Sequence, residues 1–188
     1  MPYENYCIDD RTLIVYGKFF GLSTGLLGGW KKVHCAFNHC ITDDFYRMSP
    51  VAYLKSVAKS YGLKNYFGLL TAVPIENLSI KSVKNVTAFV TAGVNNPNEM
   101  TINTIIVLES KLSGSAMLNA IITATEAKSS ALFKLGYHFT GTNTDAIVIL
   151  STMEGSYEFF AGPASRLGKR IWESVFSATT ESLRNWKK

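Results

Sequence analysis

The sequence predicts a single α+β domain in which a mixed, mostly antiparallel sheet packs against about three helices. The chain has 188 residues, a length that suits one domain covering residues 1–188. Short runs rich in Val, Ile, Thr and Phe recur along it, and three longer segments have helical periodicity. Hydrophobic residues make up 47% of the chain and charged residues 18%, which favours a packed core over disorder.

Strands are predicted where runs of apolar and β-branched residues are bounded mostly by Gly, Pro or Asn. In chain order these runs are Thr12–Tyr16, Val33–Ile41, Tyr66–Val73, Val86–Ala92, Ile102–Glu109 and Ala146–Ser151. Residues 21–29, between the first two runs, contain too many glycines for a regular element. Because the helical segments are interleaved among and after these strands, the pattern indicates α+β rather than a regular βαβ repeat.

Three helices are predicted. The first begins at Ser49-Pro50, a capping serine followed by a proline at the first helical position, and ends near Gly62. The second, Ser115–Leu135, has only a narrow polar stripe and should be buried on most sides. Lys128 projects within its apolar arc, where an ammonium needs a partner, a function or a route to solvent by snorkelling. The third, Ala164–Trp186, is amphipathic and should pack one face on the core.

The cysteines and the N-terminus predict a cytoplasmic protein. Cys7, Cys35 and Cys40 are an odd number at low density, so reduced thiols are expected rather than a disulfide scaffold. The first residues carry no positive region before an apolar run, so no secretory signal is expected. The longest stretches without a charged residue or histidine have 14 residues, and a membrane span needs about 20.

The formal net charge is +5, which is compatible with binding of a nucleic acid or an anion but does not establish it. The basic residues occur singly or in short pairs and are not interleaved with aromatics. We therefore expect solvated surface charge and no nucleic-acid partner. The oligomeric state is left open, with a homodimer among the options.

Two short motifs suggest chemistry but lack the required context. Residues 21–25 match the G-x-S-x-G string of a nucleophile elbow around Ser23, but that motif needs a following helix and a histidine after the acid. No histidine follows Asp145. His34-Cys35 and His39-Cys40 carry metal-ligand side chains, but the two pairs alternate between the faces of one predicted strand. We expect neither a metal ion nor a cofactor.

Small polar residues gather at the ends of three predicted strands, in Val90–Asn95, Thr101–Asn103 and Thr140–Asp145. Such loops can direct backbone N–H groups, hydroxyls and a carboxylate into one cleft. In the last loop, Gly141 and Asn143 can both take a positive φ. The alternative is a self-bonded turn that enters the next strand.

Taken together, these segments resemble the adenosylcobinamide amidohydrolase family of corrinoid-salvage enzymes. The resemblance rests on Gly68-Leu-Leu-Thr-Ala72, Val90-Thr-Ala-Gly-Val-Asn95, Thr101-Ile-Asn103, Thr125-Glu-Ala-Lys128 and Thr140-Gly-Thr-Asn-Thr-Asp-Ala146. Their order and spacing agree over about residues 21–168. The chain departs from the family at Asn143, where relatives usually have glycine, and at Asn96–Met100, where relatives often have a longer segment.

The resemblance implies hydrolysis of the amide that joins the aminopropanol arm of adenosylcobinamide to the corrin ring. The products would be aminopropanol and adenosylcobyric acid, which can re-enter cobalamin assembly, and the partner would be a small-molecule corrinoid. A non-catalytic corrinoid-binding protein is the alternative, and a basic nucleic-acid-binding domain is a more distant one.

Amide hydrolysis needs an activated nucleophile, stabilisation of the oxyanion and a proton for the leaving amine. We hypothesise that Glu126 or Asp145 activates water. Lys128 or Asn103 would stabilise the oxyanion. Because Glu126 and Lys128 project to nearly opposite sides of an ideal helix, both cannot easily face one cleft. Ser23 as a covalent nucleophile is the rival mechanism.

Four further residues are candidates for substrate contacts. We expect Asn95, Thr142 and Thr144 to orient the amide. His39 is the candidate for a contact with the cobalt ion of the substrate, and an ordinary buried histidine is the alternative.

Overall fold

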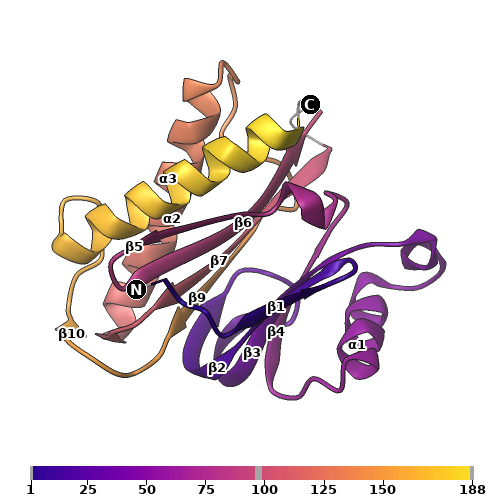
Figure 1. Ribbon diagram of the computed structural model, residues 1–188, viewed down its shortest axis with the longest axis horizontal. Helices are drawn as coiled ribbons and strands as arrows, with labels where there is room; N and C mark the ends of the chain where they lie inside the picture. The colour runs from indigo at the N-terminus through magenta and orange to yellow at the C-terminus, as the bar shows by residue number, and fades with distance from the viewer. Residues whose placement is uncertain (1, 96–98, 187–188) are drawn as a thin grey trace.

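The computed structural model describes residues 2–95 and 99–186 and confirms the α+β fold, with a mixed, mostly antiparallel sheet and three α-helices in that part of the chain (Figure 1). The helices are α1 (Pro50–Ser60), α2 (Gly114–Lys134) and α3 (Arg166–Trp186). The strands are β1 (Tyr6–Asp9), β2 (Thr12–Ser23), β3 (Gly29–Cys40), β4 (Tyr66–Thr71), β5 (Ser79–Val83), β6 (Val86–Val94), β7 (Met100–Leu108), β8 (Lys111–Leu112), β9 (Ala146–Ser151) and β10 (Tyr157–Glu158). Short 3₁₀ helices form at η1 (Asp43–Arg47) and η2 (Ile75–Asn77).

The main sheet has the strand order β4-β3-β2-β9-β7-β6-β5. The pairs β3–β4 and β7–β9 are parallel, and the other pairs of this sheet are antiparallel. β1 pairs with the first residues of β2, and β9 pairs with its last residues, Phe20–Ser23. β2 thus joins the half made of β1–β4 to the half made of β5, β6, β7 and β9.

The two halves of the sheet face each other across a shared apolar layer. Alternate residues of β2, β3 and β4 pack there against alternate residues of β6, β7 and β9, because successive side chains of a strand point to opposite faces. Fully buried Phe67 and Phe89 come from opposite halves. Any polar group in this layer must find a partner across it, because water is excluded.

Helices cover the two outer faces. α2 and α3 pack on the outer face of the half containing β5 and β6, as Figure 1 shows for α3 lying across these strands. α1 packs through Tyr53, Leu54 and Val57 on the outer face of β2, β3 and β4. The result is a four-layer arrangement of helix, sheet, sheet and helix.

The three predicted helices are confirmed and their causes are visible. The expectation that α2 is buried on most sides is wrong, because Leu118, Ile122 and Phe133 of its apolar arc are exposed. Ser49 caps α1 by accepting a hydrogen bond from Ala52 N at 3.2 Å, and Gly62 follows the helix with φ of 64°. On α3, Leu167, Ile171 and Val175 are fully buried, which confirms the amphipathic pattern. None of the described helices combines the length and apolarity that crossing a membrane requires.

One expectation about the glycine-rich segment is wrong. β2 continues through Gly21 to Ser23, so only residues 24–28 form the turn before β3. Gly21 is compatible with a strand here because the Phe67 ring packs where its side chain would be. The short strands β1, β5, β8 and β10 were not predicted. Of the segment Asn96–Met100, residues 96–98 lie outside the described residues.

Candidate active site

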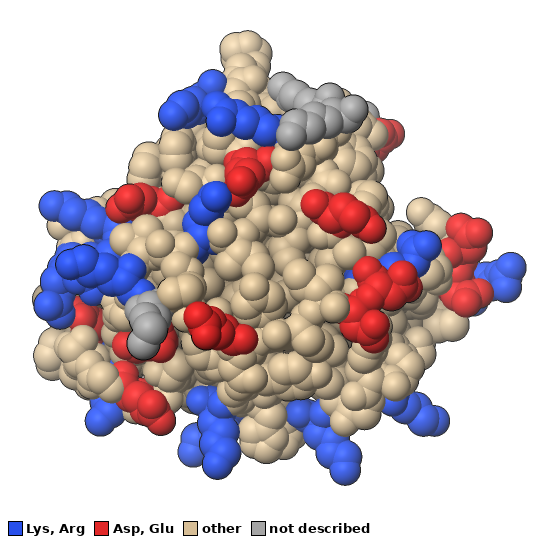
Figure 2. Space-filling view, viewed as in Figure 1, with Lys and Arg blue, Asp and Glu red and all other residues tan. Residues whose placement is uncertain are grey.

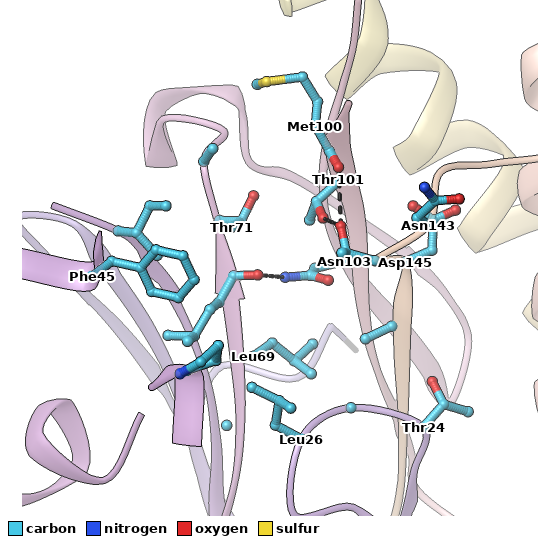
Figure 3. A pocket seen from close by; sticks show the side chains of 18 of the residues that line it. Thr24, Leu26, Phe45, Leu69, Thr71, Met100, Thr101, Asn103, Asn143 and Asp145 are labelled. Carbon is cyan, nitrogen blue, oxygen red and sulfur yellow. Dashed lines mark hydrogen bonds between the residues drawn. The ribbon is translucent and has the colours of Figure 1, made fainter. Parts of the chain in front are cut away.

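A cavity of about 770 Å³ lies where the two halves of the sheet separate at one end of the apolar layer (Figure 3). One wall is apolar and comes from β4, η1 and the start of α1. The other wall is polar and comes from β7 and the loop before β9. The apolar wall contains Ile41, Phe45, Tyr46, Pro50, Leu69 and Leu70, and the polar wall contains Thr101, Asn103, Asn143, Thr144 and Asp145.

Asp145 is the acidic residue of the polar wall, and its carboxylate accepts four hydrogen bonds. Oδ1 accepts from Ile102 N at 2.9 Å and from Thr142 Oγ1 at 2.7 Å. Oδ2 accepts from Thr142 N at 3.1 Å and from Lys128 Nζ at 2.5 Å. These bonds tie the loop before β9 to β7 and to α2, and they occupy the acceptor positions of both oxygens.

Lys128 does not snorkel to solvent. Its side chain is 9% exposed and forms an ion pair with the Asp145 carboxylate, whose side chain is 11% exposed. Lys128 is not among the residues that line the cavity, whereas Asp145 is. The ammonium therefore lies behind the carboxylate as seen from the cavity, where it pairs with Asp145.

Gly141 lets the loop close over this ion pair. A Cβ atom at this position would overlap both Asp145 Oδ2 and Lys128 Nζ. Neither Gly141 nor Asn143 uses the positive φ that its residue type permits. Glycine is needed at position 141 because the backbone passes close to the ion pair. The hydrogen bonds to Asp145, rather than a residue in the left-handed region, set the shape of the loop.

Three threonines join the loop to the start of β7. The hydroxyls of Thr101 and Thr144 are hydrogen-bonded to each other, and Thr144 Oγ1 also donates to the backbone oxygen of Met100 at 3.1 Å. Thr142 Oγ1 lies 3.1 Å from the same Met100 oxygen and 2.7 Å from Asp145 Oδ1. Since a hydroxyl has one hydrogen, Thr142 can serve either acceptor but not both fully.

A second polar network crosses the layer between the halves of the sheet. Asn38 Nδ2 donates to Thr91 Oγ1 at 2.7 Å, and Asn103 Nδ2 donates to both Asn38 Oδ1 and the backbone oxygen of Leu70 at 2.8 Å. Asn38 and Asn103 are each only 2% exposed. Sequence reasoning gave Asn38 no role, although a polar residue inside the apolar run of β3 is a signal for a partner across the layer.

The apolar wall also contains aromatic residues that the sequence analysis did not single out. Phe45 packs edge-on against Tyr53 and against Tyr46, with ring centroids 5.4 Å apart in both pairs. Tyr46 is 77% exposed at the mouth of the cavity. Nothing in the sequence around η1 distinguishes these rings from ordinary aromatic residues, because their position depends on the docking of α1.

Other candidate residues lie outside the cavity. Glu126 is exposed on α2 and Asn95 is exposed at the end of β6, and neither lines the cavity. Ser23 is buried at the end of β2, where its Oγ accepts a hydrogen bond from Gly25 N at 3.1 Å. Because β3 follows the turn, residues 21–25 form part of a strand–turn–strand hairpin, and the nucleophile-elbow geometry is absent from them.

His39 is held on the face of β3 that packs towards α1. One ring nitrogen contacts Thr12 Oγ1 at 2.8 Å and the other contacts Tyr53 Oη at 3.2 Å, and His39 does not line the cavity. Burial, and then the positive charge of Arg11, lower the pKa of His39 below its usual range. Both ring nitrogens therefore have a partner within the protein, as in the alternative of an ordinary buried histidine.

The residues of the two His/Cys pairs do not converge. Cys35 is buried between β3 and α1, where burial raises the pKa of its thiol to about 11, and His34 is exposed. Within residues 2–95 and 99–186, no three or more His, Cys, Asp or Glu side chains are placed to share a metal ion.

Comparisons with known proteins point to one family. The sequence model of the family described as adenosylcobinamide amidohydrolase matches residues 18–188. A Methanosarcina mazei protein named adenosylcobinamide amidohydrolase is 39% identical over 193 aligned positions, covering 95% of this chain and 96% of that protein. A Halobacterium salinarum protein of the same name is 26% identical over 86% of this chain and 79% of its own length. An uncharacterized protein of Methanocaldococcus jannaschii is 34% identical over 44% of this chain and 35% of its own length.

Proposed function

This chain belongs to the adenosylcobinamide amidohydrolase family, and we propose on that basis that it hydrolyses the amide between the aminopropanol arm and the corrin ring of adenosylcobinamide. Water adds to the amide carbonyl carbon and the C–N bond breaks. The carbon side becomes the carboxylate of adenosylcobyric acid, and the nitrogen leaves as aminopropanol. The acid formed can then return to cobalamin assembly.

The structural observation that supports this proposal is the two-walled cavity. A substrate with a large apolar macrocycle and a short polar arm needs an apolar surface beside a small group of polar residues. In Figure 3 the wall that contains Phe45 and Leu69 lies opposite that of Asp145 and Asn103. With a volume of about 770 Å³ and an open mouth, the cavity accommodates the arm and part of the ring. The rest of the macrocycle would lie at the mouth, next to exposed Tyr46.

Within this proposal, Asp145 is the carboxylate that activates water, because Glu126 is exposed outside the cavity. A base must have a lone pair free for the proton it accepts. The Thr142 hydroxyl can supply this by turning from Asp145 Oδ1 to the Met100 oxygen, 3.1 Å away. The Lys128 ammonium stays on Oδ2 and keeps the carboxylate in place.

Paired substitutions test this assignment. Asp145→Asn should lower kcat by at least about 100-fold, in the range usual for loss of a general base. Glu126→Gln makes the same chemical change at an exposed site and measures whether the other candidate carboxylate contributes to turnover. Turnover that survives Asp145→Asn but is lost in Glu126→Gln would show that the wrong acid has been assigned.

The function itself is tested by incubating the purified protein with adenosylcobinamide and measuring released aminopropanol by mass spectrometry. Release establishes the hydrolase, whereas tight binding without release supports the non-catalytic corrinoid-binding alternative. A nucleic-acid binder would show salt-sensitive affinity for DNA or RNA instead. Figure 2 argues against a nucleic-acid binder, because acidic side chains lie among the basic ones on the face that is drawn. The cytoplasmic location stays a prediction, and the oligomeric state stays open, with a homodimer among the options.

A further inference from the structure

The Leu70 carbonyl fixes which way the Asn103 amide faces. A backbone carbonyl oxygen only accepts hydrogen bonds, so the Asn103 atom 2.8 Å from it must be the NH₂ group. The same nitrogen donates to Asn38 Oδ1, and both of its hydrogens are therefore used. Turning the amide over would bring two oxygens within 2.8 Å of Asn103 Oδ1, which is repulsive. The remaining atom of the amide is thus an acceptor.

This acceptor, Asn103 Oδ1, is buried and has no hydrogen-bond partner among the described residues. Folded proteins leave few buried polar atoms unpaired, because each one costs free energy. Asn103 also belongs to the polar wall of the cavity, and Figure 3 shows its amide oxygen on the side opposite the hydrogen-bonded nitrogen. An unpaired acceptor at this place indicates a donor that arrives with the substrate.

We infer that Asn103 Oδ1 accepts a hydrogen bond from the N–H of the amide that is hydrolysed, and so selects secondary amides over esters. The inference rests on the proposed function and reverses the expected role of Asn103. A carbonyl oxygen repels an oxyanion, and both N–H groups that could have stabilised one are committed to Asn38 and Leu70. Asn103 therefore orients the amide plane. Since its oxygen is closed to water, a neighbouring side chain must turn aside when substrate enters.

The test compares adenosylcobinamide with its ester analogue, made from adenosylcobyric acid and propane-1,2-diol, in which oxygen replaces the N–H. The quantity measured is the ratio of kcat/KM for the amide to kcat/KM for the ester. The intrinsic reactivities of the two bonds are the same for every protein variant and cancel when ratios are compared. In Asn103→Leu the ratio should fall at least about ten-fold, the size expected for loss of one buried hydrogen bond.

Asn38→Leu is the matched control, because it makes the same substitution in the same network but keeps Asn103 Oδ1. Its ratio should stay within about two-fold of wild type even if both rates fall. An unchanged ratio in Asn103→Leu would overturn the inference and leave the hydrolase intact. No hydrolysis of either compound by the wild-type protein would remove the proposed function and the inference with it. Should Asn103→Leu not fold, Asn103→Ala, which adds no bulk, measures the same ratio.

Discussion

Lys128→Met is the substitution that most directly tests how the polar wall is built. It removes an ammonium 2.5 Å from Asp145 Oδ2 and leaves a carboxylate that is 11% exposed without its counter-ion. Breaking a buried ion pair by removing one partner costs about 3–5 kcal/mol of unfolding free energy. Three hydrogen bonds from Ile102 and Thr142 remain on the carboxylate, so we expect the lower end, about 3 kcal/mol.

For a chain of 188 residues this corresponds to a fall in Tm of about 6–12 °C. The unfolding free energy is measured by urea titration followed by circular dichroism. Lys55→Met is the matched control, because Lys55 is exposed on α1, and it should change the free energy by less than about 0.5 kcal/mol. Equal costs for the two variants would refute the view that Lys128 and Asp145 form a desolvated pair.

Three further predictions concern the loop, the mouth and a buried histidine. Gly141→Ala should destabilise the protein by about 1–3 kcal/mol, because its Cβ overlaps the ion pair; a urea midpoint equal to that of wild type contradicts the close approach. Tyr46→Ala should raise KM about 2- to 10-fold with kcat unchanged, and Tyr46→Phe should restore it; steady-state kinetics showing a fall in kcat alone would disprove a binding role for the ring. Burial lowers the pKa of folded His39, so the unfolded chain takes up that proton first and stability should be lost as pH falls below about 6.5. In urea titrations His39→Gln should lose less unfolding free energy over this pH range than wild type. Equal slopes of unfolding free energy against pH for His39→Gln and wild type would contradict this prediction.

Sequence periodicity predicted the elements that carry the core, because these have long apolar patterns. β9 was predicted with its observed bounds, Ala146–Ser151, since an acid precedes this continuous apolar run. β1 and β5 were missed because they are short and have few buried residues, and their pairing with β2 and β6 decides their conformation.

The sequence indicated some residues of the candidate site but not how they contact one another. Lys128 and Asp145 stood out because a charge in an apolar arc and an acid at the end of a threonine-rich loop are uncommon patterns. Their contact was not predictable, since it depends on how α2 packs beside β9. The same holds for Asn38 and Asn103, which are 65 residues apart in the chain and meet only because the sheet folds back on itself.

The position of Lys128 behind Asp145 neutralises the carboxylate without taking up space in the cavity. A carboxylate in a largely apolar cavity needs compensation, and an ammonium placed inside the cavity would occupy the volume that the arm requires. Supplying the ammonium from α2, beneath Gly141, compensates the charge while only Asp145 faces the cavity. The polar wall can then offer one charged group and one unpaired acceptor, Asn103 Oδ1, opposite an apolar wall that carries no charge.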